Sequence, residues 1–69
     1  MIKIHLSRIL GEKRIPQSEL SKRTGIRPNT INMYYHDYIQ RINRTDIDKL
    51  CKALDCRIED LIEYIPDKK

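Results

Sequence analysis

The sequence has few of the residues that build metal sites: two cysteines and two histidines among 69 residues. Cys51 and Cys56 form a single pair, whereas a zinc site needs two ligand pairs at defined spacing and a disulfide needs an oxidising compartment. His5 and His36 stand far from one another and show no ligand spacing with the cysteines. We therefore predict no metal site, and we expect both cysteines to be small buried hydrophobic side chains.

Motifs with a catalytic mechanism are also lacking. Neither of the two glycines lies in a Gly-rich phosphate-binding loop, and neither histidine has a partner at a catalytic spacing. The neighbouring carboxylates, Asp46 with Asp48 and Glu59 with Asp60, stand near predicted helix starts, where compensation of the helix dipole explains them. The sequence therefore indicates a protein that is not an enzyme, with no cofactor and no evident small-molecule ligand.

Long apolar runs are absent too. No stretch approaches the ~18 apolar residues of a membrane helix, and residues 1–8 lack the apolar core and cleavage site of a signal peptide. We therefore expect a cytoplasmic protein with no membrane partner. With 39% apolar and 35% charged residues the chain is typical of one globular domain, predicted over residues 1–69 with 66–69 as a frayed tail. At this size a core supplies only ~3–5 kcal/mol of net stability, so we expect support from dimerisation or DNA.

Charge is distributed unevenly along the chain. The net charge is +4, but residues 1–44 hold nine Lys/Arg against three Asp/Glu, while residues 45–69 hold five against seven. Because phosphate neutralisation dominates nucleic-acid affinity, a basic first part favours a nucleic-acid-binding face. A solvated basic surface without a ligand is the alternative that charge alone leaves open.

Residues 17–35 contain two helical patterns joined at residues 24–26. Gly25 is expected to end the first helix in the left-handed conformation, because glycine tolerates a positive φ. Ile26 is expected in the core, and Pro28 suits the first position of the second helix. In that helix Ile31, Tyr34 and Tyr35 fall at inward spacing. The opposite face carries Asn29, Thr30, Asn32 and Met33. Two helices joined by a short Gly-containing turn predict a helix-turn-helix.

The flanking segments also carry helical patterns. The first helix is predicted over residues 2–13, although the alternation in residues 1–4 leaves open a short strand paired with residues 63–66. A loop over residues 36–42 is expected to cap the core with Tyr38 or Ile39. Two further helices follow, one over residues 44–54 with Asn43 as its N-cap, and a last one stopped by Pro66. The apolar stripe of that last helix comprises Ile58, Leu61, Ile62 and Ile65. The predicted fold class is all-α, five helices without a sheet.

The positions Gln17, Leu20-Ser21, Gly25, Ile31 and Tyr34 resemble the helix-turn-helix of the Cro/CI (Xre-type) regulators. Residues 41–66 resemble the last two helices of the small stand-alone members. The resemblance therefore covers nearly the whole chain and implies a compact lambda-repressor-like bundle with helices 2 and 3 as the helix-turn-helix. The family usually has Ala where this chain has Ser21, and often Ser or Thr where Pro16 and Arg27 stand, so both helix N-caps are atypical.

The helix that starts near Arg27 is the candidate recognition helix. Asn29 suits bidentate bonding to adenine, and Arg27 suits either guanine or a phosphate. Thr30 and Asn32 could bond bases or backbone, and Met33 could pack on a thymine methyl or fill the core. The resemblance implies phosphate contacts for Gln17, Arg41 and Arg44. We also predict edge contacts from Tyr35 and His36, which follow at the end of the same helix.

The sequence thus predicts a sequence-specific DNA-binding transcriptional regulator, expected to be a repressor. Its partner would be double-stranded DNA with a pseudo-palindromic operator, bound by a homodimer that forms in solution or only on DNA. The last helix and the N-terminal segment are the candidate dimer surfaces. The alternative is a protein-interaction module, such as an antitoxin-like or anti-repressor partner, that uses the same bundle.

Overall fold

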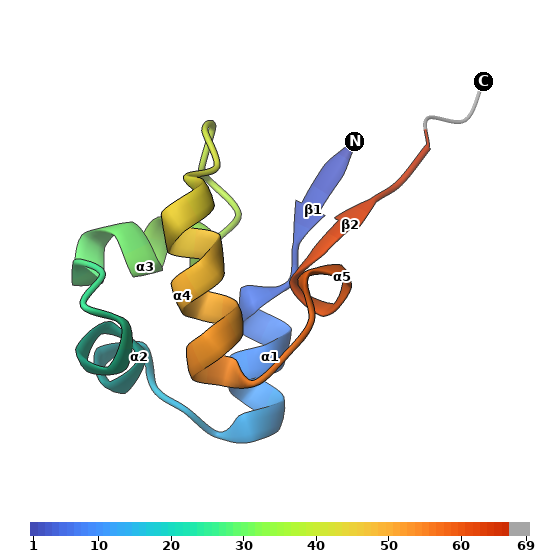
Figure 1. Ribbon diagram of the computed structural model, residues 1–69. Coiled ribbons are helices and arrows are strands. Elements are labelled where there is room, and N and C mark those ends of the chain that lie inside the picture. Colours follow the sequence, from blue (N-terminus) through green and yellow to red (C-terminus); the bar gives the residue numbers. More distant parts are fainter. Residues whose placement is uncertain (67–69) are drawn as a thin grey trace.

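The computed structural model describes residues 1–66, which form five helices and a two-stranded sheet (Figure 1). The helices surround a shared core, and the two strands lie side by side at one edge of the molecule. The elements are β1 (Ile2–Ile4), α1 (Leu6–Lys13), α2 (Gln17–Thr24), α3 (Pro28–Tyr35), α4 (Arg44–Leu54), α5 (Ile58–Leu61) and β2 (Ile62–Tyr64).

The N-terminal segment is a strand and not the first turns of a helix. The predicted helix over residues 2–13 is therefore wrong for residues 2–5. The alternative pairing of the two ends is confirmed, although the partner strand is residues 62–64 and not residues 63–66. Strand β1 pairs antiparallel with β2, with Ile2 opposite Tyr64 and Ile4 opposite Ile62. The backbone N–H of His5 then donates to the carbonyl oxygen of Leu61 at 2.7 Å. The fold is thus mostly helical but not all-α.

The last predicted helix is also shorter than its apolar stripe suggested. Helix α5 ends at Leu61, and the chain continues as β2, so Pro66 does not end a helix. Leu61 is fully buried, but Ile58 is 57% exposed, so the stripe does not all face the core. The backbone of β1 offers hydrogen-bond partners to residues 62–64, and paired backbone groups favour the strand.

The core is built from one side of each helix together with the inner end of β1. As predicted, α1 contributes Leu6, Ile9 and Leu10, and the buried hydrophobic set is completed by Ile4, Leu20, Ile26, Ile31, Tyr34, Ile47, Leu50, Leu54 and Leu61. Of the two loop candidates, Ile39 packs against this core, whereas Tyr38 is 62% exposed. The core therefore holds α3 by its inner face and leaves its other face to solvent.

The two cysteines are partly buried, which corrects the prediction that both are buried. They pack against the core where α4 ends. The N–H of Cys56 donates to the carbonyl of Cys51 (3.1 Å) and that of Asp55 to the carbonyl of Lys52 (3.4 Å), with Asp55 at φ 50°. These two bonds form the Schellman motif of helix ends. In this motif the positions held here by Cys51 and Cys56 commonly make an apolar contact. Burial, together with the neighbouring Cys51, raises the pKa of the Cys56 thiol to about 11.

Two negative findings apply to residues 1–66. In this range no helix is both long and apolar enough to cross a membrane. The same range contains no group of three or more His, Cys, Asp or Glu side chains that could hold a metal ion. Most of the predicted frayed tail, residues 67–69, lies outside the described residues.

Candidate nucleic-acid interface

The turn between α2 and α3 is held by backbone and side-chain hydrogen bonds. Gly25 adopts φ 75° as predicted, and its N–H donates to the carbonyl of Ser21 at 2.8 Å. The Ser21 hydroxyl donates to the carbonyl of Ile26 at 2.5 Å, and the Thr24 hydroxyl accepts from the N–H of Ile26 at 3.1 Å. Ile26 is 6% exposed, so it anchors the turn in the core as predicted. The serine that departs from the family pattern therefore bonds across the turn.

Both helices of the motif start without side-chain caps, at Gln17 and at Pro28. The residue before α2 is Pro16 and the one before α3 is Arg27, and neither side chain accepts a hydrogen bond from the first turn. Their carbonyl oxygens instead accept the first helical bonds, from Leu20 at 3.1 Å and Ile31 at 3.0 Å. Pro28 occupies the first turn of α3, where its fixed φ suits a helix.

Helix α3 has a buried inner face and a polar outer face. Ile31 and Tyr34 are fully buried, whereas Asn29 and Asn32 are exposed. The exposed guanidinium of Arg27 lies at the entry to the same helix. Two members of the predicted outer face, Thr30 and Met33, are partly buried. The groups best placed to reach a ligand on this face are therefore the two amides and the guanidinium.

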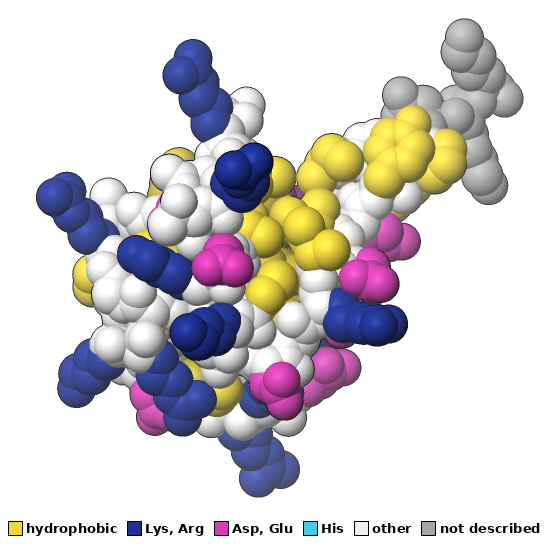
Figure 2. Space-filling view, viewed as in Figure 1, with side chains coloured by type: hydrophobic (Ala, Val, Ile, Leu, Met, Phe, Trp, Pro, Cys, Tyr) yellow, Lys and Arg dark blue, Asp and Glu magenta, His cyan; other side chains and the backbone are white. Residues whose placement is uncertain are grey.

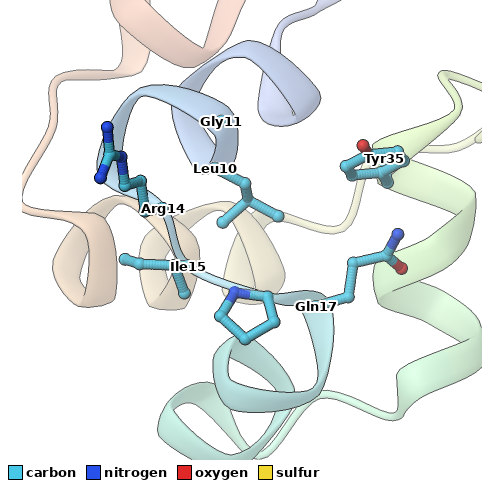
Figure 3. Close-up of a pocket in the computed structure, with 7 residues that line it drawn as sticks. Leu10, Gly11, Arg14, Ile15, Gln17 and Tyr35 are labelled. Carbon is cyan, nitrogen blue, oxygen red and sulfur yellow. The ribbon is translucent and has the colours of Figure 1, made fainter.

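Gln17 lies at the start of α2 and shares an open depression with Tyr35, near the end of α3 (Figure 3). Leu10 and Ile15 form part of its lining, and the backbone of α2 begins at its edge. Tyr35 is half-buried and packs against the core, so its ring lies in a fixed place beside the Gln17 amide. The structure thus brings together two predicted site residues from separate helices.

An aromatic group follows the end of α3. The His36 ring meets the Tyr35 ring edge-on with centroids 5.1 Å apart, and it stacks on the Tyr38 ring at 5.4 Å. The sequence reading considered Tyr38 only as a cap on the core and missed this stack. The sequence feature that could have indicated the stack is the presence of three aromatic rings, those of Tyr35, His36 and Tyr38, within four residues. The stack limits the orientations that the exposed His36 ring can take.

The segment with Arg41 and Arg44 leads into α4, and both side chains are exposed. Asn43 caps α4 as predicted: its side-chain oxygen accepts from the N–H groups of Thr45 (2.8 Å) and Asp46 (3.2 Å). The cap fixes the backbone at Arg44, the first residue of the helix. The proposed phosphate-contacting arginines thus sit on either side of a well-defined helix start.

The Tyr34 hydroxyl, which the sequence reading assigned only to the core, reaches this helix start. It accepts from the N–H of Asn43 at 3.3 Å and donates to Oδ2 of Asp46 at 3.4 Å. Burial raises the pKa of Tyr34 and the Asp46 carboxylate raises it further, while the bond from Asn43 acts in the opposite direction. The signal available in the sequence was a tyrosine at an inward position, because a buried phenol needs a polar partner.

Positive charge gathers on the part of the molecule that carries the helix-turn-helix. In Figure 2, Lys and Arg side chains project around the side built from α2, α3 and the α3–α4 connection, and acidic side chains are more frequent toward α5 and β2. One basic side chain here, Arg23, is paired with Glu19 on the same helix. Clustered positive charge of this kind raises the local concentration of polyanions and speeds their association.

A sequence model of the Cro/C1-type HTH DNA-binding domain matches residues 5–67 of the chain. The chain is also 28% identical over 65 residues to the uncharacterized HTH-type transcriptional regulator YozG of Bacillus subtilis (strain 168). That comparison covers 94% of this chain and 77% of YozG. The matched range includes all five helices, so the similarity extends well beyond the turn between α2 and α3.

Proposed function

Because the chain belongs to the family of Cro/C1-type helix-turn-helix DNA-binding domains, we propose that it is a sequence-specific DNA-binding transcriptional regulator that acts as a repressor. Helix α3 would enter the major groove with its N-terminal residues toward the base edges, as recognition helices do. The role requires no catalysis, and it places the protein in the cytoplasm, where its DNA would be.

The observation that carries the proposal is the division of α3 into two faces. Ile31 and Tyr34 are completely buried, so the helix is held rigidly by its inner side. Asn29 stands exposed in the first turn, where an amide can make two hydrogen bonds to adenine. A rigid helix that presents a short bidentate side chain near its N-terminus is suited to read sequence, since each such pair discriminates by about 1–3 kcal/mol.

Sequence-independent affinity would come from groups around that helix. Arg41 and Arg44 are exposed cations that can neutralise phosphates, and Gln17 lies at an N-terminal helix turn, which favours anions. Tyr35 lines the same depression as Gln17, and the His36 ring packs edge-on against Tyr35, so these side chains could contact the same strand of DNA. Arg27 would contact either a base or a phosphate. Thr30, Asn32 and Met33 complete the proposed set of DNA contacts.

One copy of so small a domain covers little DNA, so we expect two copies on a pseudo-palindromic operator. Two half-sites about one helical turn apart would place the two α3 helices in successive major grooves on one side of the duplex. Repression follows if the operator overlaps a promoter, because occupancy alone then excludes other proteins.

In vitro selection from a random DNA pool tests the proposal, with variants measured on the selected site. Asn29→Ala is expected to lose ~1–3 kcal/mol on the selected site and little on random DNA. Arg44→Ala is expected to weaken binding to all sequences alike and to reduce the salt slope by about one. Lys52→Ala, on an exposed position at the far end of α4, is the matched control and should change neither quantity.

The outcomes separate the two classes of function. A palindromic consensus with both variant effects supports a dimeric regulator. If the pool yields no enriched sequence and both variants bind as the parent does, the groove model is wrong. A protein-interaction module with the same bundle then becomes the better account.

A further inference from the structure

The hydroxyl group of Tyr34 lies where α3 meets the segment that carries Arg41 and Arg44. The side chain is fully buried, yet its oxygen contacts the backbone N–H of Asn43 and the carboxylate of Asp46. Those two partners flank Arg44 in the sequence, and Arg41 stands two residues before the first of them. A single buried group on the recognition helix therefore contacts the chain on both sides of Arg44.

The α3–α4 connection is anchored differently at its two ends. At its start the backbone continues from α3, with N–H groups of residues 36–38 donating to carbonyl oxygens of Asn32, Tyr34 and Met33 at 2.9–3.2 Å. At its end, the Asn43 side chain is used to cap α4, and the Asn43 N–H points back to the Tyr34 hydroxyl. The end of the connection is thus tied to α3 through that hydroxyl.

The ring and the hydroxyl of Tyr34 have separable roles. A phenylalanine ring would fill the same buried space, so core packing does not explain the oxygen. A buried phenol is kept because its polar end has partners, and here both partners belong to the start of α4. A phenol is protonated at neutral pH and burial raises its pKa further, so the hydroxyl can donate and accept at once.

We propose that Tyr34 is a positioning residue whose hydroxyl fixes Arg41 and Arg44 relative to α3, so that phosphate and base contacts engage DNA together. The inference rests on the proposed DNA-binding function and deepens it. Since phosphate contacts carry no sequence information directly, loss of the hydroxyl should weaken binding to every sequence by the same factor. The factor is the reciprocal of the fraction of molecules in which the segment is ordered as binding requires.

The expected factor is about five. An ideal bond between a phenol and a carboxylate is charge-assisted and would imply more than about tenfold. At 3.4 Å and 3.3 Å both bonds are longer than the usual ranges for O–H···O and N–H···O bonds. We therefore expect the two weak bonds together to have an effect of about fivefold, which is typical of one ordinary net hydrogen bond.

A double-mutant cycle tests the inference. Tyr34→Phe is introduced into the parent chain, into an Arg41→Ala/Arg44→Ala background and into an Asn29→Ala background. Fluorescence anisotropy then measures binding to the selected operator and to a random duplex at one salt concentration. We expect about a fivefold loss in the parent on both DNAs, the same loss with Asn29→Ala, and less than about twofold in the double-arginine background, because coupled residues are not additive.

A purely structural role would give a different pattern. If the tyrosine only supported the fold, Tyr34→Phe would weaken binding equally in all three backgrounds, and that result would overturn the inference. No loss in the parent chain would overturn it too. As a measurement on the free protein, amide exchange at Asn43 should accelerate in Tyr34→Phe while core amides such as that of Leu50 keep their protection; unchanged exchange at Asn43 contradicts the geometry directly.

Failure of the proposed function is recognised separately. The parent chain is measured first, and a parent without preference for any selected DNA refutes the regulator itself before a variant is compared. A parent that binds specifically, together with a Tyr34→Phe variant that binds just as well, refutes only the positioning role.

Discussion

The two glycines provide a matched test of the backbone conformation at the centre of the motif. Gly11 lies inside helix α1, whereas Gly25 ends α2 at φ 75°. Apart from its own local backbone, a Cβ built on either residue meets no heavy atom of the protein within 4 Å. Clashes with residues elsewhere in the fold therefore do not contribute at either position, and alanine substitutions report the local backbone conformation alone.

The expected effects have opposite signs. Gly11→Ala should raise the free energy of unfolding by ~0.5–1 kcal/mol, because glycine is that much less favourable than alanine in a helix. Gly25→Ala should lower it by ~1–2 kcal/mol, because the left-handed conformation brings the Cβ of an L-residue too close to the following carbonyl oxygen. The two variants should thus differ by about 1.5–3 kcal/mol, a large part of the ~3–5 kcal/mol available to so small a domain.

Urea denaturation followed by far-UV circular dichroism measures the difference, and equal slopes confirm that the unfolded states are comparable. In thermal scans a shift of ~4–8 °C per kcal/mol is expected for a domain of this size. If Gly25→Ala proves as stable as Gly11→Ala, the left-handed turn is not present. The account of how α3 is held at its angle to α2 would then fail.

Three further predictions concern the core, the α4 cap and pH. Leu50→Ala should cost ~2–5 kcal/mol, since the side chain is fully buried; calorimetry that finds it as stable as the exposed control Lys49→Ala would contradict the core. Asn43→Ala should cost ~0.5–2 kcal/mol through loss of the cap, which chemical denaturation can measure; an unchanged midpoint would argue against the cap. Folding raises the pKa of Cys56 from 9.0 to about 11. The contribution of the protonated thiol to the free energy of unfolding is therefore complete below pH 9 and is lost as pH rises toward 11. Across that range the free energy of unfolding should therefore fall less steeply with pH for Cys56→Ala than for the parent. Parallel pH profiles of the two proteins would refute the raised pKa of Cys56.

The helix-turn-helix could be predicted from residues close together in the chain. The apolar spacing of α3 indicated which side faces inward, and Gly25 and Pro28 marked the end of one helix and the start of the next. The structure agrees at each of these positions, since helix periodicity, turn residues and caps act over three to five residues. Exposure of Asn29 and Asn32 follows from the same periodicity, while their contacts with DNA stay predictions.

The errors lie where two distant segments meet. The spacing of Ile58, Leu61, Ile62 and Ile65 fits a helix, and nothing within that segment favours a strand. The strand forms because residues 2–4 present free backbone groups to residues 62–64, a pairing that also places His5 against Glu63 at 2.7 Å. Tertiary context overrides local propensity in such short segments.

What the sequence determined by itself was the local frame: the turn at Gly25, the start of α3 at Pro28, the cap at Asn43 and the outward polar face between them. The tertiary structure alone decided the pairing of the chain ends, the aromatic stack of His36 on Tyr38, and the contact of the Tyr34 hydroxyl with the start of α4. The physical reason is distance along the chain. Periodicity and capping depend on neighbours, whereas partners that are many residues apart, or set by the path of a loop, are chosen only when the whole core packs.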